Sequence, residues 1–282
     1  MRFATLRDGQ AILIREQQFV TLARLNFHGS LLELIQAGPS ALDQLRVALE
    51  NLNTWQSLEV TELAAPISKP GKIVAVGLNY HDHALETNLP LPEHPLVFTK
   101  FTSSITGPHD PIRLPLEITQ QTDLEVELAV VIGKTARNVP PEQALEHVFG
   151  YTVVNDLTAR NVQFGDGQWV RSKSFDTFCP MGPVIVTLDE LQDAKQLRLG
   201  SSINGQTMQD SSTSNLIFGV CELISQLSQS FTFDPGDVLI TGTPAGVGYV
   251  RKPPKYLQPG DTVRVWIEGI GTLENSVIAR EL

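Results

Sequence analysis

Apolar residues along the chain alternate with polar ones mainly with a period of two, which predicts strands more often than helices. The clearest example is the stretch 124–132, where Leu124, Val126, Leu128, Val130 and Ile132 alternate as in a strand. Other runs that predict strands are 3–13, 19–22, 73–76, 96–98, 151–154, 184–186, 197–203, 238–240, 262–267 and 272–278. The pair Asn204-Gly205 follows one of them and is typical of a two-residue hairpin turn. We therefore expect a fold built mainly of strands.

Helical patterns are fewer. Ser30 is expected to cap a helix that ends before Gly38, and Ser40, with Asp43 three residues on, resembles a capping box ahead of a leucine stripe. Further helices are expected at 140–147 and 216–227. Because strands and helices do not alternate regularly, a doubly wound sheet or a TIM barrel is not expected. The pattern favours an α+β fold, mainly β, in the form of a mostly antiparallel sandwich or roll with peripheral helices.

A break in the pattern lies at 65–71, where two prolines and a glycine indicate a linker. We expect residues 1–69 to form a small N-terminal α/β accessory domain and residues 70–282 to form the larger β-rich domain.

Composition narrows the class of protein. The 282 residues are 41% hydrophobic and 18% charged, which is enough for a packed core. The net charge of −10 argues against nucleic acid or an anionic membrane as partner. Two cysteines make no disulfide framework, and no segment approaches the roughly 20 apolar residues of a membrane span. We therefore expect a soluble, cytoplasmic protein.

Carboxylates give the strongest chemical signal. Glu125 and Glu127 alternate with the apolar residues of the strand at 124–132 and so share a face. Asp156 follows the apolar strand expected at 151–154. If the two strands are neighbours, three carboxylates meet, and such an oxygen set favours Mg²⁺, Mn²⁺ or Ca²⁺ over Zn²⁺. Two alternatives remain: the glutamates form the solvent face of a half-buried strand, and Asp156 is a helix N-cap. The apolar continuation of the strand argues against the first.

A second signal is His83, with Glu86 three residues later on a helical turn. A carboxylate beside an imidazole orients it and raises its basicity, as a water-activating base requires. The alternative of His81 and His83 as zinc ligands lacks a third ligand at a matching spacing. These residues could equally be ordinary polar groups of a turn. A glycine-rich stretch at 242–248 also fits a loop that holds an anion, and a substrate carboxylate is a better candidate there than a phosphate.

Together these motifs resemble those of the fumarylacetoacetate hydrolase family, from Lys72 onward. The motifs are Gly77-Leu78-Asn79-Tyr80 with His83 and Glu86; Phe98-Thr99-Lys100; Glu125-Val126-Glu127; Asp156-Leu157-Thr158-Ala159-Arg160 with Gln163; Lys173-Ser174-Phe175-Asp176; and the run 241–248. The resemblance implies a mixed β-sandwich roll with a small N-terminal accessory domain, a bound Mg²⁺ or Mn²⁺ (Ca²⁺ as a further candidate), and a homodimer.

The resemblance also implies roles for residues. Glu125, Glu127 and Asp156 are expected to bind the metal. His83 and Glu86 form the water-activating dyad, and Lys173 matches the active-site lysine. Substrate contacts are expected from Arg160, Gln163, Thr243 and Lys100. Asn161 stands where many members have aspartate, which puts the hydrogen bonding around Arg160 in doubt.

The implied substrate is a small 2-oxo acid. We expect metal-dependent hydrolysis of a C–C bond in an acylpyruvate, in which His83 activates water and the metal and Lys173 stabilise an enolate. Decarboxylation of oxaloacetate or isomerisation of a 2-hydroxy-diene-dioate at the same site are the enzymatic alternatives. A Ca²⁺-stabilised β-domain that binds a carboxylated ligand without turnover is the non-enzymatic one.

Overall fold

Two packed β-sheets form the framework of the protein, and a computed structural model describes residues 1–192 and 194–281. The large sheet contains β1 (Arg2–Leu6), β2 (Ala11–Arg15), β3 (Gln18–Thr21), β4 (Gln56–Ser57), β5 (Leu63–Ala64), β6 (Ile73–Gly77), β7 (Leu96–Thr99), β8 (Ile105–Thr106), β11 (Val126–Ile132), β12 (Val148–Asn155), β14 (Cys179–Thr187) and β17 (Val238–Ile240). The five-stranded sheet contains β9 (Ile112–Leu114), β15 (Arg198–Ile203), β16 (Gln206–Ser212), β18 (Thr262–Ile267) and β19 (Gly271–Ala279). A separate pair joins β10 (Thr122–Asp123) to β13 (Thr158–Ala159).

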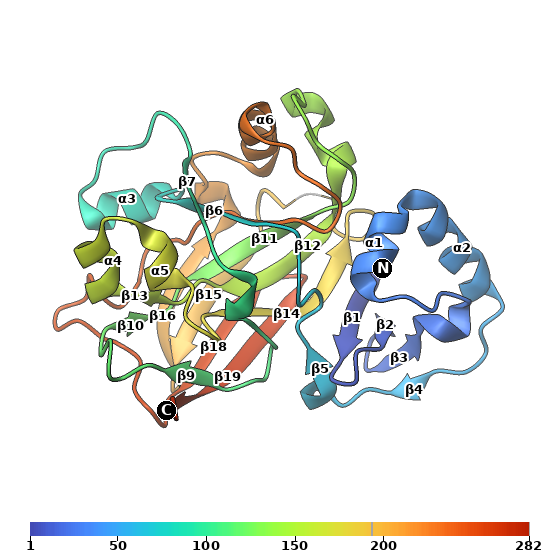
Figure 1. The fold of residues 1–282 in the computed structure, drawn as a ribbon, viewed down its shortest axis with the longest axis horizontal. Coiled ribbons are helices and arrows are strands. Elements are labelled where there is room, and N and C mark those ends of the chain that lie inside the picture. Colours follow the sequence, from blue (N-terminus) through green and yellow to red (C-terminus); the bar gives the residue numbers. More distant parts are fainter. Residues whose placement is uncertain (193, 282) are drawn as a thin grey trace.

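Helices lie around these sheets. The α-helices are α1 (Leu31–Ala37), α2 (Pro39–Glu50), α3 (His81–Thr87), α4 (Arg160–Asp166), α5 (Trp169–Lys173) and α6 (Val220–Ser230). Short 3₁₀ turns are η1 (Leu22–Leu25), η2 (Val60–Glu62), η3 (Thr102–Ser104), η4 (Pro141–His147) and η5 (Thr213–Asn215). Figure 1 shows α3, α4 and α5 grouped on the side of the molecule opposite α1 and α2.

The strands of the large sheet run in the order β4-β3-β2-β1-β14-β12-β11-β17-β6-β7, with β5 beside β1 and β8 beside β14. Most neighbours are antiparallel, but β17 pairs with β6 in parallel. The N-terminal strands continue this sheet because β1 pairs with β14. The boundary that we place between residues 69 and 70 falls between β5 and β6, and the division into two domains remains a proposal.

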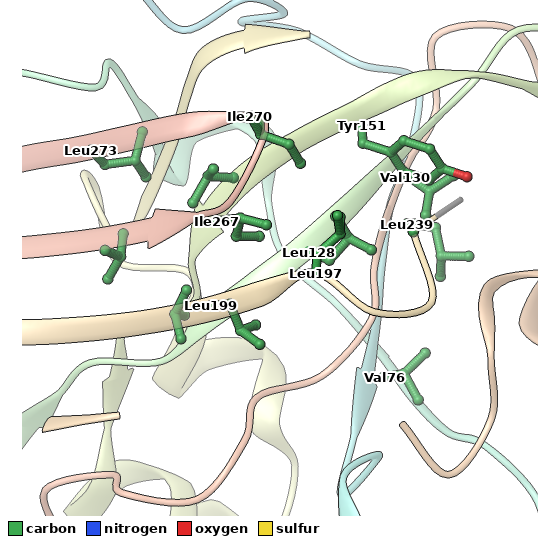
Figure 2. Close-up of a cluster of buried hydrophobic side chains, with 14 of the residues drawn as sticks. Val76, Leu128, Val130, Tyr151, Leu197, Leu199, Leu239, Ile267, Ile270 and Leu273 are labelled. Carbon is green, nitrogen blue, oxygen red and sulfur yellow. The ribbon is translucent and has the colours of Figure 1, made fainter. Parts of the chain in front are cut away.

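The main core lies between the two sheets (Figure 2). Leu128 and Val130 of β11 and Tyr151 of β12 meet Leu199 of β15 and Leu273 of β19 there, and all five are at most 1% exposed. The other face of β11 is buried as well, with Ala129 and Val131 in separate apolar clusters. A strand that is buried on both faces has no solvent side, so any charged group on it must find partners inside the protein.

Two sequence-based expectations about helices are wrong. Ser40 caps no helix, because α2 already begins at Pro39, whose fixed φ suits the first helical position. The helix expected from residue 216 starts at Val220, because η5 and an extended Leu216 paired with Tyr80 precede it. The helix expected at 140–147 is present, as a 3₁₀ helix over 141–147 with proline at its first position. The capping box at Ser30 is present, with Glu33 as its partner.

Within the described residues, no helix has both the length and the apolar character needed to cross a membrane.

Candidate active site

The pairing of β11 with β12 brings three carboxylates together. In this register Val126 is opposite Asn155, so that Glu125, directly before β11, lies beside Asp156, directly after β12. The amide of Asp156 donates to the carbonyl of Glu125 at 2.8 Å, which fixes the two strand ends against each other. Glu127 is two residues along β11 on the same face as Glu125. Ligand oxygens of Glu125, Glu127 and Asp156 all lie within 4.8 Å of one another.

Two buried lysines surround this cluster. Lys173, at the end of α5, places its ammonium 2.7 Å from Glu125 Oε2, 2.6 Å from Asp156 Oδ2 and 2.8 Å from Thr158 Oγ1. Lys100 approaches from the segment after β7 and contacts Asp156 Oδ1 at 2.6 Å. Each oxygen of Asp156 is therefore paired with a lysine. Asp156 caps no helix, so the alternative role of a helix N-cap is wrong.

An arginine completes the set of cations. Arg160, the first residue of α4, contacts Glu125 Oε1 at 2.6 Å and Asp123 Oδ2 at 2.8 Å. It also donates to Gln163 Oε1 at 3.0 Å, and its guanidinium lies 4.4 Å from the ring centre of Tyr249. Glu125 is thus neutralised on both oxygens.

The protonation of the glutamates follows from these contacts. Burial alone would raise the pKa of Glu125, but Lys173 and Arg160 outweigh it and lower the pKa to about 2. Burial raises the pKa of Glu127 well above its ordinary value, and the negative charges of Asp156 and Glu125 raise it further. Burial would lower the pKa of Lys173, yet Asp156 and Glu125 keep it above its usual value. The cluster therefore holds a charged lysine beside a glutamate that resists ionisation.

The residues present fit a divalent cation. Across the described part of the chain, Glu127 forms no ion pair, although it is only 2% exposed. Counting Asp123, four buried carboxylates face three buried cations, namely Lys100, Arg160 and Lys173, so one negative charge is uncompensated whenever Glu127 is ionised. A buried charge without a partner is costly, and an oxygen-only ligand set is typical of Mg²⁺, Mn²⁺ or Ca²⁺.

The histidine and glutamate of the sequence motif form a contact. His83 Nδ1 lies 2.7 Å from Glu86 Oε1, one turn along α3. Both oxygens of Glu86 also accept the amide of Gly246, at 3.1 and 3.0 Å, so the carboxylate is fixed from two sides. His81 is exposed, and the carboxylate cluster found among the described residues contains no histidine. The zinc alternative is thus unsupported.

The glycine-rich loop 241–249 does hold anions, but they are the protein's own. The amide of Gly242 donates to Glu127, that of Ala245 to Asp82 at 3.3 Å and that of Gly246 to Glu86. The amides of Gly248 and Tyr249 donate to Asp123 at 2.7 and 3.0 Å. Because these five amides donate to side-chain carboxylates, they are not available to a substrate carboxylate, and binding of a substrate carboxylate by the rest of the loop stays a prediction.

A cavity of about 240 Å³ opens onto these groups. Its wall includes seven of the ten residues expected in the site: His83, Glu125, Glu127, Arg160, Gln163, Lys173 and Thr243. Glu86 and Asp156 lie behind this wall, where Glu86 contacts His83 and Asp156 contacts Lys173. Lys100 is 2% exposed and is not part of the wall, so the structure places it beside Asp156 and away from the cavity. Thr243 lines the cavity, but its hydroxyl already donates to the Val126 carbonyl.

Several residues of the site escaped the sequence analysis. Asp123, which pairs with Arg160, continues the same alternation as Glu125 and Glu127, so its signal was present in the sequence. Tyr249 and Trp169 come from distant segments and carry no motif of their own. Gly77 is required beside Trp169, because a Cβ there would overlap the indole ring. Asn161 replaces the expected aspartate and bonds to the Ile118 carbonyl at 3.1 Å, which leaves the pairing of Arg160 intact.

Comparison with known proteins agrees with this geometry. The family model described as fumarylacetoacetate (FAA) hydrolase C-terminal matches residues 72–278. The oxaloacetate tautomerase fahd2 of Xenopus laevis mitochondria is 46% identical over 248 residues, which cover 87% of this chain and 77% of that protein. The oxaloacetate tautomerase YisK of Bacillus subtilis is 44% identical over 260 residues, 88% of this chain and 86% of that protein.

A solved structure extends the comparison to the whole chain. Maleylpyruvate hydrolase from Sphingobium sp. SYK-6, in complex with manganese(II) and pyruvate, superimposes with a TM-score of 0.85 at 30% identity and covers 100% of both chains. These relatives are enzymes, so the non-enzymatic binding domain considered above is set aside. The chain belongs to the fumarylacetoacetate hydrolase family and is an enzyme of its hydrolase, decarboxylase or isomerase type.

Proposed function

We propose that this enzyme catalyses keto–enol tautomerisation of oxaloacetate. One observation supports the proposal above all: two glutamates of the carboxylate cluster, a charged lysine and a glutamate-oriented histidine line the same small cavity. Such a site can hold the negative charge that develops on the 2-oxo oxygen while a base removes a proton from carbon 3. The names of the Xenopus and Bacillus relatives support oxaloacetate as the substrate.

We propose Glu125, Glu127 and Asp156 as the ligands of Mg²⁺ or Mn²⁺. The manganese in the maleylpyruvate hydrolase structure supports a divalent ion of this class. When bound, the ion acts as a Lewis acid toward the oxygens of the 2-oxo acid. It would also supply the positive charge that Glu127 lacks.

The other groups have distinct tasks. Glu86 accepts a hydrogen bond from the Nδ1–H group of His83, which leaves the lone pair of Nε2 available to take the proton from carbon 3. Lys173 keeps its charge near the developing oxyanion, because Glu125 and Asp156 hold its pKa high. Arg160 and Gln163 lie in the same cavity wall and would bind the second carboxylate of oxaloacetate.

Hydrolysis of an acylpyruvate is the second candidate function. It is favoured by the contact between His83 and Glu86, because this pair can remove a proton from water as well as from carbon. The water would then attack the distal carbonyl, and the bond between that carbon and carbon 3 would break. Both reactions use the same stabilisation of charge on the 2-oxo oxygen.

The test is a substrate panel with metal add-back. The protein is stripped with a chelator, and Mg²⁺ or Mn²⁺ is restored. Loss of the enol absorbance of oxaloacetate, pyruvate release from oxaloacetate and cleavage of acetylpyruvate are then followed separately. We expect metal-dependent tautomerisation to be fastest. Absence of metal-dependent turnover of all of these compounds would contradict the proposed function.

A further inference from the structure

The cavity has a second, apolar part beyond the carboxylate cluster. Its wall is built from Leu78 after β6, Leu89 after α3, Leu96 and Phe98 of β7, Phe164 of α4 and Trp169 of α5. Phe98 and Trp169 pack edge to face, with ring centres 5.4 Å apart, so this surface has a defined shape. Leu89, Leu96 and Phe164 are 51%, 46% and 65% exposed and form the mouth. A substrate longer than its reacting head must therefore extend along apolar side chains.

The two cations of the cavity wall direct their hydrogen bonds mainly away from this apolar part, although the Lys173 ammonium lies 5.0 Å from the ring centre of Phe98. The three protons of the Lys173 ammonium already face Glu125, Asp156 and Thr158. Arg160 directs four of its five N–H groups to Asp123, Glu125 and Gln163, and we assign the remaining proton, on Nη1, to the second carboxylate of a short acid.

Other cations near the mouth are also unsuited to bind an anion there. Arg171 of α5 is paired with Asp166 at 2.5 Å through one nitrogen and 2.6 Å through another. His94 lies in the same connecting segment as Leu89 but is not part of the cavity wall. Among the described residues of the wall, the cations are Arg160 and Lys173 alone.

From these contacts we propose that the apolar part of the cavity binds an uncharged substituent of the 2-oxo acid and discriminates against a carboxylate at that distance. The inference rests on the proposed function and specifies its substrate class. Short acids such as oxaloacetate fit because their second carboxylate stays beside Arg160 and Gln163. Acylpyruvates with an alkyl tail fit because the tail buries its methylenes against Leu89, Leu96 and Trp169. Seven-carbon dioates are disfavoured, because their far carboxylate gives up part of its water beside half-exposed apolar side chains without gaining a cationic partner.

Two probes of equal length, neither of which has a bond that hydrolysis or decarboxylation would cleave, test this inference. 2-Oxoheptanoate ends in a methyl group and 2-oxoheptanedioate in a carboxylate. Their binding to the Mn²⁺-loaded full chain is measured by calorimetry and, separately, as competitive inhibition of oxaloacetate turnover. We expect 2-oxoheptanoate to bind at least about tenfold more tightly than the dioate. In Leu89→Arg, a cation at the mouth should reduce or reverse this preference.

Leu85→Arg is the matched control. Leu85 is also a leucine of the α3 region and is 83% exposed, but it is not part of the cavity wall. Its variant adds the same charge and should keep the native preference. Equal or tighter binding of the dioate by the native protein would overturn the inference, as would equal shifts in both arginine variants. If neither probe binds while oxaloacetate is turned over, the inference alone falls; if oxaloacetate is not turned over either, the proposed function falls with it.

Discussion

Replacing Glu127 by glutamine should make the metal-free protein more stable and abolish its response to metal. Glu127 is fully buried, and its carboxylate is the one member of the cluster without a cationic partner among the described residues. Glutamine has the same shape and still offers an oxygen to the amide of Gly242. The substitution therefore removes the uncompensated charge and little else.

The sign follows from the direction of the pKa shift. Because the pKa of Glu127 in the folded protein is raised, ionising this group costs folding free energy at high pH. We expect Glu127→Gln to gain about 1 to 3 kcal/mol at pH 8 in the presence of a chelator. The gain should shrink as the pH falls toward 4.5, the ordinary value, because the native carboxylate then becomes protonated in both states.

Metal binding provides the second half of the prediction. At a Mn²⁺ concentration of about 100 Kd, the ion stabilises the native fold by about 2.7 kcal/mol. For a chain of 282 residues, that corresponds to a rise in Tm of about 5 °C. Glu127→Gln should show almost none of this rise in a calorimetric scan, and Glu62→Gln, at an exposed site, should show all of it. A variant that is less stable than the native protein without metal, yet equally stabilised by Mn²⁺, would refute the assignment.

Other substitutions test the remaining groups. His83→Gln should slow tautomerisation and acylpyruvate hydrolysis about a hundredfold but decarboxylation much less, because loss of CO₂ needs no proton removal; equal losses in steady-state assays would contradict this role. Lys173→Met should lower kcat/KM at least about a hundredfold, and native kinetics would deny the lysine its place in the site. Lys100→Met should cost about 3 to 5 kcal/mol in denaturant unfolding by leaving Asp156 Oδ1 unpaired, and a cost near zero would show that the pair is unimportant. Light scattering should give the mass of a homodimer, and a monomer would remove that expectation.

Much of the fold could be predicted from local patterns. The period-two alternation of residues 124–132 identified β11, and Asn204-Gly205 identified the hairpin of β15 and β16. Helix starts were less predictable, because a serine three residues before an acid also occurs inside a helix, as Ser40 does. The pairing of Tyr80 with Leu216 that delays α6 depends on a contact across the fold.

The candidate site was predictable where its residues lie on regular strands. Glu125 and Glu127 share a face by simple geometry, whereas Asp156 joins them only through the register of β12, which the sequence does not specify. A motif gives the position of Lys100 in the chain but not the direction of its side chain. The motif suggested a substrate contact, whereas in the structure the buried ammonium contacts Asp156. The apolar wall of the cavity, with Trp169, is assembled from separate segments and could not be foreseen.

The loop 241–249 has a consequence for how this protein can be altered. Five of its backbone amides donate hydrogen bonds to four carboxylates. One of these carboxylates belongs to the proposed metal cluster, two belong to α3, and one pairs with Arg160. A deletion or insertion of one residue in the loop would therefore disturb all of these groups at once. Substitutions at the cavity mouth should not disturb these groups, because Leu89 and Phe164 are largely exposed. Libraries that seek new specificities should diversify the mouth and leave the loop untouched.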